Sequence, residues 1–301
     1  MKQPIEVTGG PGGSVFLLDS GEKTALYDCG MAYCAPVMLE RLRTVLAGRT
    51  LDCMFISHSH YDHIAAMPYL RQAYPKVVVY GSDHARQVFE RPGALETIRM
   101  LSQEAAEYYG APGSMPPYDD DLLKVDVPVG EGDAVDLGGG VAVRVLATPG
   151  HTRCCLTFVA GEEYIFPSET TCYKSLSGAV YPAFLSGCAD AVTSLYHCAR
   201  QHIPRIMAPH YGLVSQAETP GYWQACLDSI LESRDFILAA GRRGLDEEGI
   251  IKAYEDRFRD DEIRAEQPDT AFVINTRAMI RTTLREDAAG IRSPYEGKPL
   301  D

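Results

Sequence analysis

The feature that most constrains this chain is a group of potential metal ligands at residues 57–63, which read Ser-His-Ser-His-Tyr-Asp-His and hold three of the eight histidines. A strand-like apolar run precedes the group and a helical pattern follows it. Residues two apart in an extended segment point the same way, so His58 and His60 can hold one ion together. Asp62 and His63 are adjacent and lie where the chain turns into the helix, which suits a second ion. The sequence therefore predicts a metal site at a strand-to-helix turn.

This pattern resembles the metal-binding signature of the metallo-β-lactamase superfamily. Three more motifs follow the family's order: an Asp-x-Gly that ends an early strand, a Pro-Gly-His-Thr turn and a Pro-His-Tyr-Gly turn, which contribute Asp28, His151 and His210. The resemblance covers roughly residues 5–215. It implies an α/β fold, a four-layered αββα sandwich with the metals at one edge of its two sheets.

The resemblance also implies two divalent ions and divides the ligands between them: His58, His60 and His151 for the first ion, and Asp62, His63 and His210 for the second. Asp28 would brace the metal-binding turn from behind. Asp62 has a second candidate role, as the catalytic carboxylate that orients the nucleophile or carries its proton. Zinc is the default metal for imidazole and carboxylate ligands, with iron and manganese as alternatives.

One position departs from the family pattern. The family usually places an Asp where its carboxylate bridges both ions, and this chain has Glu169 there. A glutamate supplies the same oxygens but is one methylene longer. We expect Glu169 to bridge the ions; the alternative is an exposed loop acid with no bridge.

The order of apolar runs and helical stretches predicts two parts. Close pairs of short strands near the start indicate hairpins and a mixed sheet. Residues 110–121, rich in Pro, Gly and acidic side chains, indicate an exposed loop. From residue 221 onward three helical patterns follow one another, at 221–240, 246–258 and 270–286. We therefore expect a catalytic domain at 1–217 and a helical extension at 218–301 that walls the substrate pocket, contacts a second subunit, or does both.

The expected chemistry is hydrolysis of an ester-like bond in a small molecule. A helical extension also occurs in glyoxalase-II-like and quinolone-signal-response-like thioesterases, and this resemblance favours a thioester or another acyl ester. A lactone or a phosphodiester is the alternative. The segment 173–187 leaves the site directly after Glu169, so Tyr173, Tyr181 and Phe184 are candidate pocket residues. Tyr211, beside His210, is another, and ordinary packing is the alternative for all four.

Two other classes of protein remain open. Flavodiiron redox proteins share the fold, but they normally carry Glu at the position of His60 and add a flavodoxin domain. A regulatory or binding protein that retains the metal site is the second alternative. Metal analysis with a redox titration distinguishes the first, and a substrate panel distinguishes the second.

Composition narrows the partners and the location. The formal net charge of −13, with the Lys and Arg residues scattered along the chain, argues against nucleic acid. No apolar run approaches the roughly 20 residues that cross a bilayer, so we expect no membrane partner. The start has no apolar stretch typical of a secretory signal, and we expect a cytoplasmic protein. Nine cysteines without a Cys-x-x-Cys motif indicate reduced, buried thiols.

Overall fold

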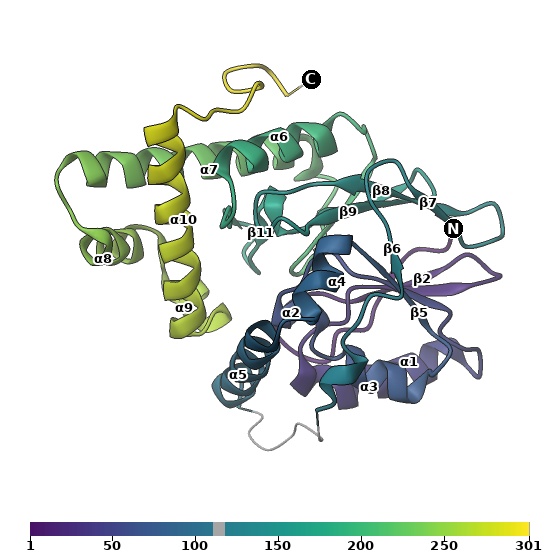
Figure 1. The fold of residues 1–301 in the computed structure, drawn as a ribbon. Helices are drawn as coiled ribbons and strands as arrows, with labels where there is room; N and C mark the ends of the chain where they lie inside the picture. Colours follow the sequence, from purple (N-terminus) through teal and green to yellow (C-terminus); the bar gives the residue numbers. More distant parts are fainter. Residues whose placement is uncertain (111–117, 301) are drawn as a thin grey trace. The chain divides into compact units, whose positions relative to one another are not determined.

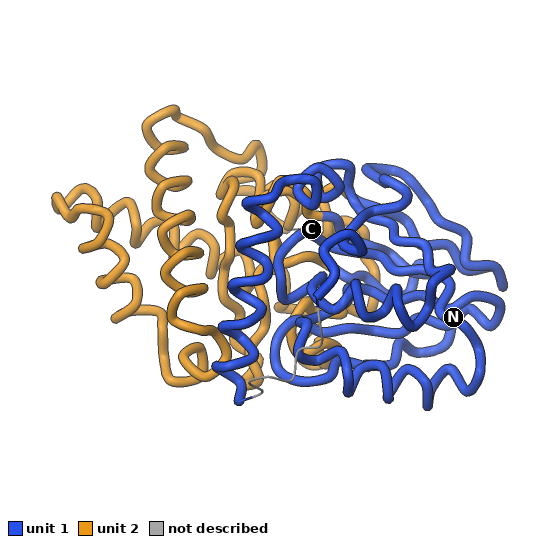
Figure 2. The backbone as a smooth tube through the Cα atoms, turned by 60° about the horizontal axis from the view of Figure 1, so that its bottom comes forward, with its two compact units in different colours: residues 1–146, 156–166 blue, residues 147–155, 167–301 orange. Residues whose placement is uncertain are grey.

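The computed structural model describes residues 1–110 and 118–300 (Figure 1). Of the predicted loop at 110–121, residues 111–117 lie outside this description. The chain forms two compact units, coloured in Figure 2. Unit 1 comprises residues 1–146 and 156–166, and unit 2 comprises residues 147–155 and everything from 167 onward. Each unit is described by itself below.

The first sheet of unit 1 is mixed, as the sequence predicts. Its six strands run in chain order: β1 (Ile5–Glu6), β2 (Phe16–Asp19), β3 (Thr24–Tyr27), β4 (Cys53–Phe55), β5 (Val78–Gly81) and β6 (Val127–Pro128). The pairs β1–β2 and β2–β3 are antiparallel, and the pairs from β3 to β6 are parallel. Every residue of β3 and β4 is buried, which explains why these strands are continuous apolar runs rather than alternating ones.

A second sheet in unit 1 packs face to face on the first. Its strands, in the order β10–β9–β8–β7, are β7 (Ala134–Asp136), β8 (Ala142–Ala147), β9 (Leu156–Ala160) and β10 (Tyr164–Phe166). Aromatic rings fill the space between the sheets: the ring centroids of Phe55 and Phe158 are 5.3 Å apart, and those of Tyr27 and Phe166 are 4.9 Å apart. Such ring contacts stabilise a core by more than the burial of their apolar surface alone.

Helices cover the other face of the first sheet (Figure 1). The helices of unit 1 are α1 (Ala35–Leu46), α2 (Tyr61–Ile64), α3 (Met67–Ala73), α4 (Asp83–Phe89) and α5 (Pro92–Tyr108), with short 3-10 helices η1 (Ala32–Cys34) and η2 (Asp120–Leu122). In α1, Met38, Leu42 and Leu46 recur every four residues and are buried. Unit 1 thus contains a helical layer and two sheet layers.

Unit 2 is mainly helical. Its elements are η3 (Glu169–Thr171), the hairpins β11 (Tyr173–Lys174) with β12 (Val180–Tyr181) and β13 (Arg205–Ala208) with β14 (Gly212–Leu213), and the helices α6 (Cys188–Ala199), α7 (Thr219–Arg242), α8 (Glu247–Phe258), α9 (Asp261–Glu266) and α10 (Asp269–Ala289). The predicted helical tail is confirmed. The sequence did not predict α9, whose six residues are too few for an apolar period, although Asp260 caps its first turn.

The apolar stripes of the tail are buried within unit 2. Ile230 and Ile237 of α7, and Met279 and Ile280 of α10, are almost fully covered. The predicted boundary near residue 217 lies inside this unit, where α7 begins. Compact units are defined by packing, whereas a domain is a part that folds or acts independently. The division into domains at 1–217 and 218–301 therefore stays a prediction. Across residues 1–110 and 118–300, no helix combines the length and the apolarity needed to cross a membrane.

Candidate metal centre

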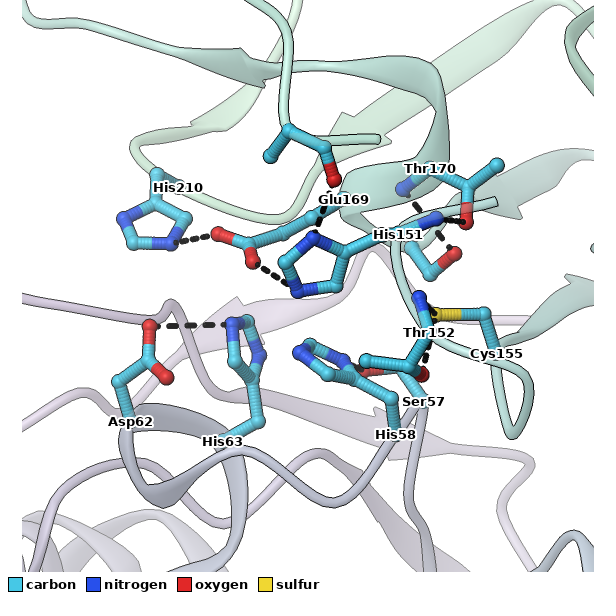
Figure 3. Close-up of polar contacts among 12 residues, drawn as sticks. Ser57, His58, Asp62, His63, His151, Thr152, Cys155, Glu169, Thr170 and His210 are labelled. Atoms are coloured by element: carbon cyan, nitrogen blue, oxygen red, sulfur yellow. Dashed lines mark hydrogen bonds and ion pairs between the residues drawn. The ribbon is translucent and has the colours of Figure 1, made fainter. Parts of the chain in front are cut away.

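The ligand turn of unit 1 forms because an extended segment runs directly into a helix. Before α2 begins at Tyr61, His60 has extended backbone angles, so His58 and His60 point to the same side as the sequence predicts. The ring centroid of His58 lies 4.8 Å from that of His60 and 4.4 Å from that of His63. Nε2 of His63 lies 3.3 Å from a carboxylate oxygen of Asp62. Unit 1 therefore gathers four candidate ligands on one short turn, of which Figure 3 labels His58, Asp62 and His63.

The carboxylate of Asp28 holds this turn from within the core. It is fully buried and accepts hydrogen bonds from the main-chain N–H of Ser57 at 2.7 Å and from the Ser57 hydroxyl at 2.9 Å. It also lies 2.8 Å from Nδ1 of His63. The left-handed backbone of Asp28, with a φ of 57°, turns its side chain from the end of β3 toward the ligands. One carboxylate thus fixes both ends of the turn.

These contacts determine which imidazole nitrogen can bind a metal. The single hydroxyl proton of Ser57 goes to Asp28, so the hydroxyl oxygen accepts from Nδ1 of His58, 2.9 Å away. His63 likewise gives its Nδ1 proton to Asp28. Nδ1 therefore carries the proton in both rings and Nε2 becomes the ligand atom, which is the usual arrangement around a metal-bound histidine.

The charges around His63 favour a cation. Burial lowers the pKa of His63, but the carboxylates of Asp62 and Asp28 outweigh burial and hold that pKa well above its usual value. A site that stabilises a proton on the imidazole in this way also stabilises a metal ion beside it, since both are positive charges facing the same two acids. The ligand set of unit 1 fits a divalent metal.

The ligands of unit 2 converge on one carboxylate. Oε2 of Glu169 lies 2.9 Å from Nε2 of His151, and Oε1 lies 2.7 Å from Nε2 of His210 (Figure 3). Glu169 opens η3 and is only 7% exposed, so it is not the exposed loop acid of the alternative. Nδ1 of His151 donates to the carbonyl oxygen of Ala183 at 2.6 Å, which again turns Nε2 toward the carboxylate.

Two close approaches explain why glycines flank the ligands. At Gly150, with a φ of 145°, an added Cβ would lie 2.6 Å from Cα of Ala191, so the Pro-Gly-His turn accepts no side chain there. At Gly13, an added Cβ would lie 2.5 Å from the carbonyl oxygen of Asp62. The glycines thus allow two close backbone contacts next to ligands, one between the turn of His151 and α6 and one between Gly13 and Asp62.

The predicted pocket residues lie in different surroundings within unit 2. Tyr173 packs its ring 5.6 Å from that of His210 and stacks on Tyr181 at 5.6 Å. Tyr211 lies 6.5 Å from His210 by ring centroids. Burial and the hydrogen-bonded Glu266 carboxylate raise the pKa of the Tyr211 phenol. Phe184 is fully buried and belongs to the core of the unit. Among the described residues, His84, His197 and His202 join neither ligand group.

Sequence reasoning missed three groups that orient the ligands. Ser57 stands inside the recognised motif, so its position was visible but its role was not. The Thr170 hydroxyl donates to the carbonyl of Thr148 at 2.7 Å and accepts from the N–H of His151 at 3.1 Å, and its place directly after Glu169 was the only signal. The Ala183 carbonyl belongs to the main chain and has no sequence signal.

Removal of the Asp28 charge tests the support of the turn. Asp28→Asn keeps the shape but leaves one acceptor oxygen for the hydrogen bonds from Ser57 and His63, so we expect zinc affinity to fall by about 10–100-fold. Competition with a chromophoric chelator measures the affinity. Asp52→Asn is the matched control, since its carboxylate accepts from the N–H of Thr24 at 2.8 Å and contacts no ligand. Equal zinc affinity in the two variants would contradict the role of Asp28.

Comparison with known proteins places this geometry in a family. The metallo-β-lactamase superfamily model matches residues 8–164, which is more than half of the chain. A hydroxyacylglutathione hydrolase from Bradyrhizobium sp. is 28% identical over 125 residues, which are 41% of this chain and 35% of that protein. The chain spans between 12% and 44% of the length of the curated relatives that it matches.

Solved structures show the same fold at low identity. A metallo-β-lactamase family protein from Thermus thermophilus has a TM-score of 0.63 and 17% identity, covering 96% of this chain and 95% of that one. An archaeal superfamily protein from Sulfolobus tokodaii has a TM-score of 0.59 and 18% identity, covering 95% of this chain and 99% of that one. With the family match and the ligand motifs in the family's order, the chain belongs to the metallo-β-lactamase superfamily.

Proposed function

We propose that this protein is a metal-dependent hydrolase that cleaves an acyl ester of a small molecule, with a thioester as the preferred bond. The observation that carries the proposal is the contact of one buried carboxylate, Glu169, with both His151 and His210, one oxygen to each. A buried carboxylate that faces a histidine of each ion set with a separate oxygen suits a dinuclear centre. The relative named as a hydroxyacylglutathione hydrolase supports the thioester.

We assign the ligands as the family motifs imply. His58, His60 and His151 would hold the first ion, Asp62, His63 and His210 would hold the second, and Glu169 would serve both. Zinc is our choice of metal, with iron and manganese as the alternatives for the same donors. When bound, such ions supply Lewis acidity to the scissile carbonyl and to the attacking water.

The remaining chemistry falls to the protein's own side chains. The side chain of Asp62 is 14% exposed, whereas that of His63 is 0% exposed. Solvent therefore reaches the Asp62 carboxylate. We assign it to orient the attacking water and to pass a proton to the leaving group. The phenol of Tyr211 is engaged by Glu266, so we give Tyr211 no part in proton transfer.

A lactonase or a phosphodiesterase would use the same ligands, so a substrate panel decides between them. The purified chain is reconstituted with zinc, its metal content is quantified, and thioester, lactone, phosphodiester and β-lactam substrates are compared. We expect about two ions per chain and the highest kcat/KM on a thioester. Turnover confined to the phosphodiester would refute the proposed bond. Reversible redox chemistry of an iron-loaded protein that hydrolyses none of them would refute the hydrolase.

A further inference from the structure

Unit 2 contains a cavity of about 180 Å³ between the segment after Glu169 and the tail helices. One wall comes from β11, β12 and the two residues that follow, and the others come from α7, α8, α9 with the residue after it, and α10. Five aromatic rings face it, those of Tyr173, Tyr181, Tyr254, Phe258 and Phe272. The tail and the segment 173–187 therefore enclose a common space, most of it apolar.

The lining accepts an uncharged group. None of the described residues that line the cavity is Lys, Arg or His, and its one acid, Glu232, is paired with Arg257 at 2.8 Å. Arg257 and Arg259 lie over the rings of Phe258 and Phe272, but both are already paired with acids. An anionic group such as a carboxylate or phosphate would therefore enter at a high desolvation cost. The cavity is consequently unsuited to the charged thiol half of a glutathione or nucleotide-bearing thioester.

Two of the three lining tyrosines, Tyr181 and Tyr254, present their rings rather than their hydroxyls. The phenol of Tyr181 donates to a carboxylate oxygen of Asp260 at 3.1 Å, and the phenol of Tyr254 shares a hydrogen bond with Ser233 at 2.9 Å. With these hydroxyls engaged, both residues offer faces and edges suited to stacked or T-shaped contact with another ring. An apolar cavity of about 150 Å³ is large enough for benzene, so this one takes a single ring with a short extension.

Two residues connect the cavity to the ligands of the same unit. Ala183 lines it, and the Ala183 carbonyl accepts the Nδ1 proton of His151. Tyr173 also lines it, and its ring packs against that of His210. Ala183 thus stands between the cavity and His151, and Tyr173 stands between the cavity and His210, the two histidines that contact Glu169.

We propose that this cavity is the acyl subsite, and that it binds a neutral acyl group the size of one aromatic ring. The inference rests on the proposed hydrolase function and names the class of substrate for it. The charged or polar thiol half stays outside the cavity. Aryl and arylalkyl thioesters are then preferred over acetyl thioesters, which leave the cavity unfilled, and over long-chain thioesters, which exceed it.

The test compares three thioesters that share the leaving group N-acetylcysteamine: the acetyl, phenylacetyl and dodecanoyl esters. On the full chain with its metals, we expect kcat/KM for the phenylacetyl ester to exceed the other two by about tenfold or more, as burial of one apolar ring predicts. Asn275→Trp places a large ring in the cavity from a half-buried position on α10. It should abolish this preference, whereas Ile274→Trp, which lies outside the lining, should keep the order of the three kcat/KM values.

A binding measurement separates the subsite from the activity. Acetophenone, a neutral aryl ketone with no bond to hydrolyse, is titrated by calorimetry into the same full chain. We expect Asn275→Trp to weaken its binding by about tenfold or more. Gln267→Trp, which fills the cavity from the residue that follows α9, should do the same and guards against a folding defect in either variant. Ile274→Trp is the matched control, because Ile274 is 42% exposed on α10 and lies outside the lining.

The two failures differ in their results. Equal kcat/KM on the three thioesters, with acetophenone bound equally by the wild type and both cavity variants, would overturn the acyl subsite and leave the hydrolase standing. No turnover of any thioester, with acetophenone still lost in the cavity variants, would overturn the proposed function and with it the assignment of the cavity to an acyl group.

Discussion

Replacing His58 and His151 together by alanine is expected to lower kcat/KM by about a thousandfold or more and to leave about one metal ion per chain. Both residues belong to the ligand set that we assign to the first ion, and each offers its Nε2 because its Nδ1 is already held, by Ser57 and by the Ala183 carbonyl. Loss of one catalytic metal removes several kcal/mol of transition-state stabilisation, at 1.36 kcal/mol for each factor of ten. Elemental analysis and steady-state kinetics on the best thioester measure the two effects.

The matched control removes two histidines that join no ligand group. His84 lies on α4 in unit 1 and His197 lies on α6 in unit 2, so His84→Ala with His197→Ala repeats the substitution once in each unit. We expect this variant to keep both ions and its activity. An unchanged metal content in the His58 and His151 variant would rule out our ligand assignment, and equal losses in both variants would trace the effect to folding.

The ligand turn was predictable because its information is local. Two histidines at a spacing of two residues, placed between an apolar run and a helical pattern, determine the direction of their side chains without reference to the rest of the chain. The tail helices were predictable for a similar reason, since an apolar period over about twenty residues marks a buried face. Within that tail, Ile274 is 42% exposed, because it is two residues from both Phe272 and Thr276, whose buried side chains lie on the opposite side of α10.

What the sequence could not predict depends on contacts between distant segments. The carbonyl of Ala183 orients His151 from 32 residues away, and a main-chain group leaves no mark in the choice of residue. The cavity beside it needs the rings of Tyr254, Phe258 and Phe272 as well as the two tyrosines that the sequence marks as pocket candidates, and each of these three rings reads as ordinary core in its own segment. The sequence located Glu169 but could not assign its role, because only the burial of its side chain and the residues that it contacts distinguish a bridging carboxylate from a surface acid.

Replacing Glu169 by glutamine is expected to lower kcat by about a hundredfold and to weaken the second ion by about 10–100-fold. The substitution preserves the volume of the buried side chain, but its amide has one acceptor oxygen, and the NH₂ group would face Nε2 of either His151 or His210. The negative charge that would balance two cations is lost as well. Glu169→Asp should recover much of the activity, since it keeps both oxygens and is the residue usual in the family. Metal titration and steady-state kinetics compare the three proteins.

Glu286 offers the control for a buried carboxylate without a ligand role. It is 7% exposed, as Glu169 is, and it accepts from the N–H of Ala189 at 3.1 Å within unit 2. Glu286→Gln should therefore reproduce whatever neutralising a buried acid does to stability, while metal content and kcat stay at the wild-type level. A bridge predicts that only Glu169→Gln loses the second ion and that Asp rescues it. If Glu169→Gln retained both ions with full affinity, the two contacts of Glu169 would be packing contacts and the second ion would be held by Asp62, His63 and His210 alone.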